Sequence, residues 1–199
     1  VDTFYAGRIS PEALSALSKS FPIYFIIIAA SIGVTVAGTS LIGNSIGEKD
    51  ENKVLNYFTH IIFYGIIISI AISLFGLNYA KNIFQIMGSS NEVTSLGLQY
   101  TNIIFYGSIF FISVVSLNSL LHAEGDTKTY RNVLILSFFL NIILNPILIF
   151  GFLFIPPMGI KGIGVATIIS QLFSLIIILI KVLKNNRVKN LTKKYFLLK

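Results

Sequence analysis

The sequence contains no cysteine, and charged residues make up only 12% of it. The lack of cysteine excludes disulfide bonds and metal sites built from thiolates. The shortage of charge excludes a soluble domain, because a soluble fold of 199 residues needs a charged outer surface. Hydrophobic residues account for 54% of the chain, and the mean hydropathy is +0.82. These values indicate a membrane protein that is surrounded by lipid.

Reactive side-chain sets are also lacking. The sequence shows no Ser/His/Asp set, no paired histidine ligands for a metal and no phosphate-binding loop, so we do not expect an enzyme. No segment resembles a signal peptide. The chain begins at Val1 rather than Met, inside a helical-looking segment, and we therefore expect a fragment without its natural N-terminus.

Long apolar runs predict an all-α, polytopic membrane helix bundle. Five full spans are expected at about residues 20–43, 57–77, 98–121, 133–155 and 159–181, because a helix needs ~20 residues to cross the hydrocarbon. Short polar connectors separate the spans, and no long aqueous domain is present.

The basic residues divide unevenly between the two sides of these spans. One side has eleven of the fifteen Lys and Arg residues, and the other has Arg8, Lys19, Lys81 and Lys161. The positive-inside rule places the eleven in the cytoplasm, which predicts a multi-pass protein of the cytoplasmic membrane with a cytoplasmic basic tail. The tail at 181–199 has seven basic residues and no acid, and anionic lipid headgroups explain it without nucleic-acid binding.

Ionisable side chains inside the membrane are costly, so each is a candidate functional group. Only Asp2 and His60 qualify. His60 lies near the cytoplasmic start of its span and is interpreted as an interfacial histidine. Asp2 would be a solvated terminal residue unless a helix precedes it.

The stretch NIILNPILIFG at 141–151 places two carboxamides and a proline at membrane depth. Asn141 and Asn145 are four residues apart and project from one helical face. Pro146 has no amide hydrogen, so the carbonyl of Ile142 becomes free to bind a cation, a water or a neighbouring hydroxyl. The pattern fits a polar binding stripe, and it fits interhelical hydrogen bonding equally well.

Two further stretches mix small and polar residues at helical spacing, at 31–40 and 162–171. Small residues allow helices to approach closely, which explains the glycines. Hydroxyl and amide side chains such as Thr167 and Gln171 need polar partners. Thr35, Thr39 and Gln171, together with Pro146, are candidates for substrate binding or helix packing.

Several motifs together resemble the multidrug and toxic compound extrusion (MATE) family. VDTFYAGRISPEALSALSKSFPI is similar to the end of that family's first helix and the entry into the second. SLIGNSIGEKDENK resembles the connector after its second helix. HAEGDTKTYRNVLILSFFLNIILNPILIFG and MGIKGIGVATIISQ resemble the fourth-to-fifth helix region and the start of the sixth. The motifs follow the family's order over nearly the whole chain.

The resemblance implies one half of a twelve-helix fold. Residues 1–183 would be its N-terminal lobe, with five spans and the end of a sixth, and 184–199 a linker toward a missing second lobe. In the family an acid on the first helix, with polar groups on the fifth and sixth, binds the coupling Na⁺ or H⁺, and no other cofactor is implied. The corresponding residues are Asp2, Asn141, Asn145 and Thr167, with Pro146 beside them.

One position departs from the family pattern, which has an acid before the fifth-helix proline where this chain has Asn145. An amide offers only a neutral oxygen, whereas a carboxylate takes up a proton or neutralises Na⁺. Coupling would then depend on Asp2 alone.

The expected function is cation-coupled export of lipophilic, often cationic, small molecules by alternating access. A related lipid-linked oligosaccharide flippase is a second interpretation, although it should have several basic residues in its central cavity. Two further interpretations stay open, namely an inactive truncated fragment and a half-length subunit that pairs with another chain.

Overall fold

The structure is a computed structural model that describes residues 1–189. Within these residues the chain is helical apart from its connectors, and Phe152 and Ile155 form one isolated bridge. Five helical segments are long and apolar enough to cross a membrane. The predicted all-α membrane bundle is confirmed.

The first three helices are α1 (Asp2–Ile9), α2 (Pro11–Gly47) and α3 (Glu51–Ile86). Ser10 is extended and separates α1 from α2, and its hydroxyl accepts a hydrogen bond from the Ala13 amide at 3.0 Å. Asp50 caps α3 through the Lys53 amide. Both long helices extend beyond the predicted apolar spans 20–43 and 57–77, because the capping residues lie further out than the apolar runs.

The predicted third span, 98–121, is divided into α4 (Asn91–Tyr106) and α5 (Ser108–Ala123) by Gly107. A Cβ atom on Gly107 would lie 1.9 Å from Cδ1 of Ile168, so the Ile168 side chain of α7 packs closely against this glycine. Two-thirds of the most apolar part of this segment (67%) is buried in the bundle, against 17–33% for the other spans. α4 and α5 therefore form the centre of the bundle.

The last helices are α6 (Thr127–Phe150), α7 (Ile160–Leu183) and α8 (Asn186–Lys189). α6 ends at Phe150, five residues before the predicted limit of 155, because Gly151 turns the chain with a φ of 82°. A Cβ atom on Gly162 would lie 2.7 Å from the Leu148 carbonyl, so the glycine allows α6 and α7 to pack closely. α8 occupies part of the predicted linker at 184–199, and residues 190–199 lie outside the described part of the chain.

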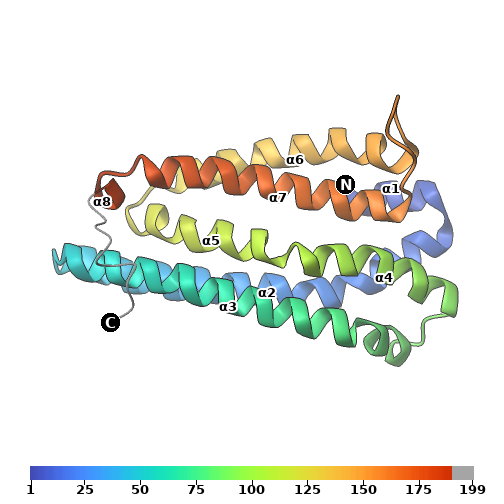
Figure 1. Ribbon diagram of the computed structural model, residues 1–199, viewed down its shortest axis with the longest axis horizontal. Helices are drawn as coiled ribbons and strands as arrows, with labels where there is room; N and C mark the ends of the chain where they lie inside the picture. Colours follow the sequence, from blue (N-terminus) through green and yellow to red (C-terminus); the bar gives the residue numbers. More distant parts are fainter. Residues whose placement is uncertain (190–199) are drawn as a thin grey trace.

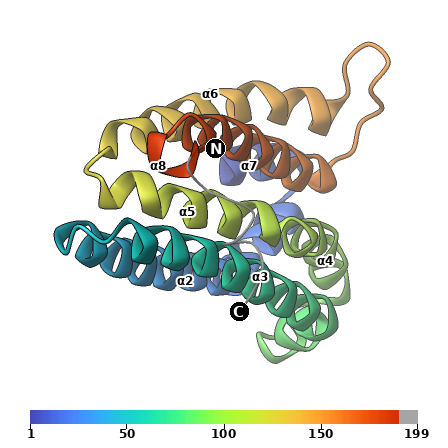
Figure 2. The same cartoon turned by 60° about the vertical axis from the view of Figure 1, so that its left-hand side comes forward.

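The helices lie side by side, with α6 and α7 covering one side of α5 and α2 and α3 covering the other (Figures 1 and 2). The connectors with many basic residues meet at one end, where α8 also lies (Figure 1). The α1–α2, α3–α4 and α6–α7 connectors meet at the opposite end. This arrangement agrees with the division of charges predicted from the sequence.

Candidate functional site

The site forms where the short helix α1 meets α6 and α7. α1 packs against α2 and leads from the α1–α2 connector back into the bundle, so the N-terminus lies beside α7 (Figure 1). The side-chain contacts of Asp2 with α6 and α7 place it between helices. Ser10 makes this possible, because its extended backbone (φ −167°) lets α1 fold back against α2.

Both oxygens of the Asp2 carboxylate accept hydrogen bonds from neutral side chains. Asn145 Nδ2 of α6 donates to Oδ1 at 3.3 Å, and Thr167 Oγ1 of α7 donates to Oδ2 at 3.2 Å. Asp2 therefore joins α1 to two helices that lie more than a hundred residues further along the sequence.

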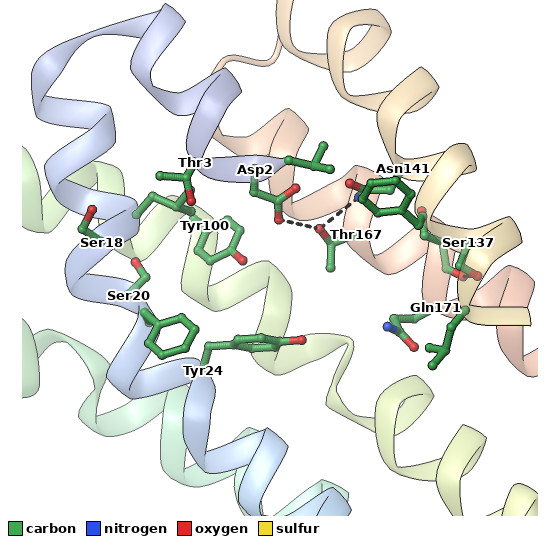
Figure 3. A pocket seen from close by; sticks show the side chains of 16 residues that line it. Asp2, Thr3, Ser18, Ser20, Tyr24, Tyr100, Ser137, Asn141, Thr167 and Gln171 are labelled. Carbon is green, nitrogen blue, oxygen red and sulfur yellow. Dashed lines mark hydrogen bonds between the residues drawn. The ribbon is translucent and has the colours of Figure 1, made fainter. Parts of the chain in front are cut away.

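Asn141 completes the cluster. Its Nδ2 donates to Thr167 Oγ1 at 3.4 Å, and its Oδ1 accepts from Asn145 Nδ2 at 2.9 Å (Figure 3 shows the bonds of Thr167). Asn145 is fully buried, yet its Oδ1 has no hydrogen-bond partner within residues 1–189. A buried carbonyl oxygen without a partner is costly in a low-dielectric interior. The cluster thus has a free acceptor next to its carboxylate.

Pro146 acts through the backbone. The Ile142 carbonyl, which Pro146 deprives of its helical partner, accepts a hydrogen bond from the Tyr5 hydroxyl at 3.4 Å. Of the three partners expected for this carbonyl, the structure has the neighbouring hydroxyl. Tyr5 is therefore a second link between α1 and α6, three residues after Asp2.

A cavity of about 690 Å³ opens beside the cluster (Figure 3). Asp2, Asn141, Thr167 and Gln171 belong to its lining, whereas Asn145 and Pro146 of the predicted stripe do not. Further aromatic and hydroxyl groups that no sequence motif indicated also line it, among them Tyr24, Tyr100, Ser18, Ser20 and Ser137. Tyrosine and serine are frequent in this sequence, so no local signal distinguished these members.

Other candidates lie elsewhere. Thr35 donates to the Ser31 carbonyl one turn back in α2, and Thr39 pairs with the His122 ring at 3.5 Å. His60 bonds the Asn56 carbonyl within α3. None of these three lines the cavity.

Chemically, the cluster is one carboxylate surrounded by neutral oxygen and amide groups. Carboxylate, amide and hydroxyl oxygens are ligands for hard cations, and a single negative charge balances one monovalent cation or one proton. Both interpretations of the Asn141–Asn145 stripe, a polar binding site and interhelical hydrogen bonding, fit this cluster. The same contacts join the helices and surround the Asp2 carboxylate.

The profile of the MatE family matches residues 1–147, which is most of the chain. The chain belongs to the MatE family. It is similar to the N-terminal half of a MATE protein, as the motif order predicted.

Three relatives illustrate the similarity. The probable multidrug resistance protein YoeA of Bacillus subtilis is 28% identical over 169 residues, which are 85% of this chain and 36% of YoeA. The probable multidrug resistance protein NorM of Thermotoga maritima is 32% identical over 85% of this chain and 37% of NorM. A FAD transporter of Shewanella oneidensis is 28% identical over 87% of this chain and 38% of its own length.

Solved structures have the same fold. The inward-facing form of a multidrug resistance MATE family transporter superposes with a TM-score of 0.90 at 26% identity, covering 100% of this chain and 44% of that one. The chain thus spans less than half the length of the relatives it matches, and it is a multi-pass membrane protein.

Proposed function

We propose that the chain is one lobe of a cation-coupled efflux transporter that exports lipophilic, often cationic, small molecules. The observation that carries the proposal is the Asp2 carboxylate, held between α1, α6 and α7 by Asn145 and Thr167. Family membership and the names of YoeA and NorM support efflux. The coupling ion, Na⁺ or H⁺, would bind at Asp2, Asn141, Asn145 and Thr167.

Binding of a cation would change what joins α1 to the other helices. In the described geometry the Asn145 amide and the Thr167 hydroxyl point hydrogens at the carboxylate. A Na⁺ ion would require oxygens instead, and the unpaired Oδ1 of Asn145 could serve as one. Either cation therefore reorganises the contact between α1 and α6–α7, and we infer that this shifts the lobe between inward-open and outward-open states.

The cavity supports export of lipophilic cations over flipping of anionic oligosaccharide lipids. Its lining combines Tyr24, Tyr100, Phe21 and Phe138 with hydroxyl groups, and no Lys or Arg belongs to the lining described for residues 1–189. Aromatic faces attract cations, whereas a phosphate-bearing lipid needs basic partners.

The partners follow from the same proposal. The lobe would sit in the cytoplasmic membrane with its basic tail in the cytoplasm, and it would work with a second six-helix lobe, on the same or another chain. Relatives more than twice as long as the matched segment support that second lobe.

Substitution of Asp2 tests the proposal. Full-length protein with Asp2→Asn, reconstituted in vesicles, should lose efflux of a fluorescent lipophilic cation driven by a Na⁺ or H⁺ gradient, while its insertion and helix content stay unchanged. Glu92→Gln, at an exposed acid in the first turn of α4, is the matched control and should transport normally. Efflux at the native rate in Asp2→Asn would remove Asp2 from the mechanism.

A further inference from the structure

The connector between α6 and α7 forms a small apolar hairpin that stands clear of the bundle. Two backbone hydrogen bonds pair Phe152 with Ile155, at 3.1 and 3.0 Å. The two residues at its apex, Leu153 and Phe154, are 82% and 99% exposed. All six residues at 152–157, FLFIPP, are exposed, and none is polar. A contiguous exposed apolar patch of this kind indicates a contact surface.

The apex has unusual residues for a turn in water. Leu153 has a φ of 51°, in the left-handed region, at the first central position of a two-residue turn. Such turns favour glycine or asparagine, because a bulky side chain is crowded at positive φ. Leucine followed by phenylalanine is instead a sequence that we expect where the apex is surrounded by an apolar environment.

The hairpin is attached to α6 through its backbone. The Met158 amide donates to the Leu148 carbonyl at 2.9 Å, and the Gly159 amide donates to the Ile149 carbonyl at 3.1 Å. These bonds satisfy carbonyls at the end of α6. At Gly151 a Cβ atom would lie 2.9 Å from the Ile155 carbonyl oxygen, so the two arms approach closely. The direction of the hairpin is thus set by the end of α6.

The position along the chain places the hairpin at a membrane surface. No charged residue occurs between Arg131 and Lys161. The helix from Val133 to Phe150 rises roughly 27 Å at ~1.5 Å per residue, close to the ~30 Å of the hydrocarbon. If Arg131 lies at one headgroup layer, the start of the hairpin and Lys161 lie at the other.

The hairpin also points sideways. In both views the α6–α7 connector extends outward beyond α6, across the direction of the helices rather than along it (Figures 1 and 2). An element that leaves the bundle sideways at this depth lies over the surrounding lipid instead of projecting into water.

We propose that residues 151–157 form an interfacial anchor that inserts Leu153 and Phe154 between the headgroups and acyl chains of the phospholipid bilayer. The anchor lies at the end of the bundle opposite the basic connectors. Lys161, exposed just after the hairpin, is placed to meet a lipid phosphate. Because the hairpin is bonded to the end of α6, it fixes the depth of the helix half that includes Asn145 and Pro146.

The fluorescence of a single tryptophan at the apex reports whether lipid, water or protein surrounds it. This chain contains no tryptophan, so Phe154→Trp introduces its only indole, whose emission is excited selectively at wavelengths that the nine tyrosines do not absorb. In phosphatidylcholine vesicles we expect blue-shifted emission that lipids with brominated acyl chains quench and aqueous iodide does not. Glu92→Trp, at an exposed position at the same end of the bundle, is the control and should respond to iodide only.

Two results would overturn the anchor. Quenching of the Phe154→Trp variant by iodide, as in the control, would place the apex in water. Protection from both quenchers would mean that protein covers it, either a second lobe or a second copy.

A second variant separates anchoring from folding. Leu153→Asn with Phe154→Gly supplies residues that the turn favours, so the hairpin should persist. With Phe152→Trp as the probe, this pair of changes should reduce quenching by brominated lipid and increase quenching by iodide. Unchanged quenching would show that the apex side chains do not hold the hairpin in the bilayer.

Discussion

Asp2 is a candidate ion-binding residue because of its neighbours on α6 and α7. The sequence alone indicated a terminal acid, and the MATE resemblance implied a preceding helix, which would make Asp2 an intramembrane group. The structure brings it to Asn145 and Thr167, as the resemblance implied for these positions. Their roles in cation coupling stay predictions.

Thr167→Val removes the hydroxyl that bonds Asp2 Oδ2 and keeps the side-chain shape. A hydrogen bond to a charged group contributes about 1.5–3 kcal/mol, or roughly 10–100-fold in affinity. If Na⁺ drives efflux, the half-saturating Na⁺ concentration should rise by that factor, because an oxygen ligand is lost. If H⁺ drives efflux, the half-maximal rate should move to higher pH, because the carboxylate loses a donor that favours its charged form.

Thr101→Val is the matched control for this measurement. Thr101 is buried, its hydroxyl bonds the Gly97 carbonyl within α4, and it does not belong to the lining of the cavity. Gradient-driven efflux with the native ion dependence is expected. An equal change in both threonine variants would show that the effect comes from packing and not from Asp2.

Residues contributed by distant elements were the hardest to predict. The spacing of Asn141 and Asn145 predicted one polar stripe, and both belong to the cluster. Tyr5 was missed, because nothing in the sequence says which hydroxyl reaches the Ile142 carbonyl. Thr35 and Thr39 have the same helical spacing as the site residues but bond elsewhere, since spacing does not fix which neighbour a helix face meets.

α1 and α6 are joined by the bond from Tyr5 to Ile142, which exists because Pro146 leaves that carbonyl free. Tyr5→Phe should lower the free energy of unfolding by about 1 kcal/mol, or Tm by about 2–4 °C. In a Pro146→Ala background the restored amide can bond the Ile142 carbonyl. Tyr5→Phe should then lower the free energy of unfolding much less. Thermal unfolding of the four proteins in detergent measures the difference, and an equal cost in both backgrounds would contradict the link.

The start of α6 should depend on pH. Asp126 caps the helix and accepts bonds from the Thr129 hydroxyl at 2.6 Å and the Thr129 amide at 3.0 Å. These bonds, with Lys181 at 3.8 Å, lower the pKa of the Asp126 carboxyl below its ordinary value of 3.8. A lowered pKa means that the charged form stabilises the fold above the ordinary value and that this contribution is lost as pH falls through the lowered one.

Asp126→Asn keeps a good capping residue without the charge. The native protein should have the higher Tm at neutral pH, by at most about 2–4 °C, because exposed charges are screened. The difference should vanish as pH falls below the ordinary range of aspartate. A difference that stays constant across a thermal-unfolding series from neutral to acidic pH would contradict the assignment.

The number of spans could be read from the sequence, because lipid requires long apolar helices. The break at Gly107 could not, since one glycine inside an apolar run is common and does not by itself mark the end of a helix. The end of α6 was predicted five residues too late, because the apolar hairpin continues the hydropathy of the helix. Apolar character therefore identifies the segments in contact with the membrane, but it does not distinguish a helix from an apolar connector.

The lobe is expected to need a partner lobe, because alternating access needs two bodies that move around one site. The intact mass of the native membrane protein should be near twice this chain's 22.0 kDa, or the 22.0 kDa chain should be recovered in a complex. A 22.0 kDa monomer that transports by itself would contradict the two-lobe proposal.

If Asp2 binds the ion whose movement drives export, then ion movement should depend on its carboxylate. The most direct measurement is the ion flux produced by a substrate gradient in vesicles, followed as ²²Na⁺ uptake and as internal pH. The native protein should move one of these cations against the substrate, and Asp2→Asn should move neither while still binding the fluorescent lipophilic cation. Cation movement at the native rate in Asp2→Asn would show that the coupling ion does not bind at Asp2.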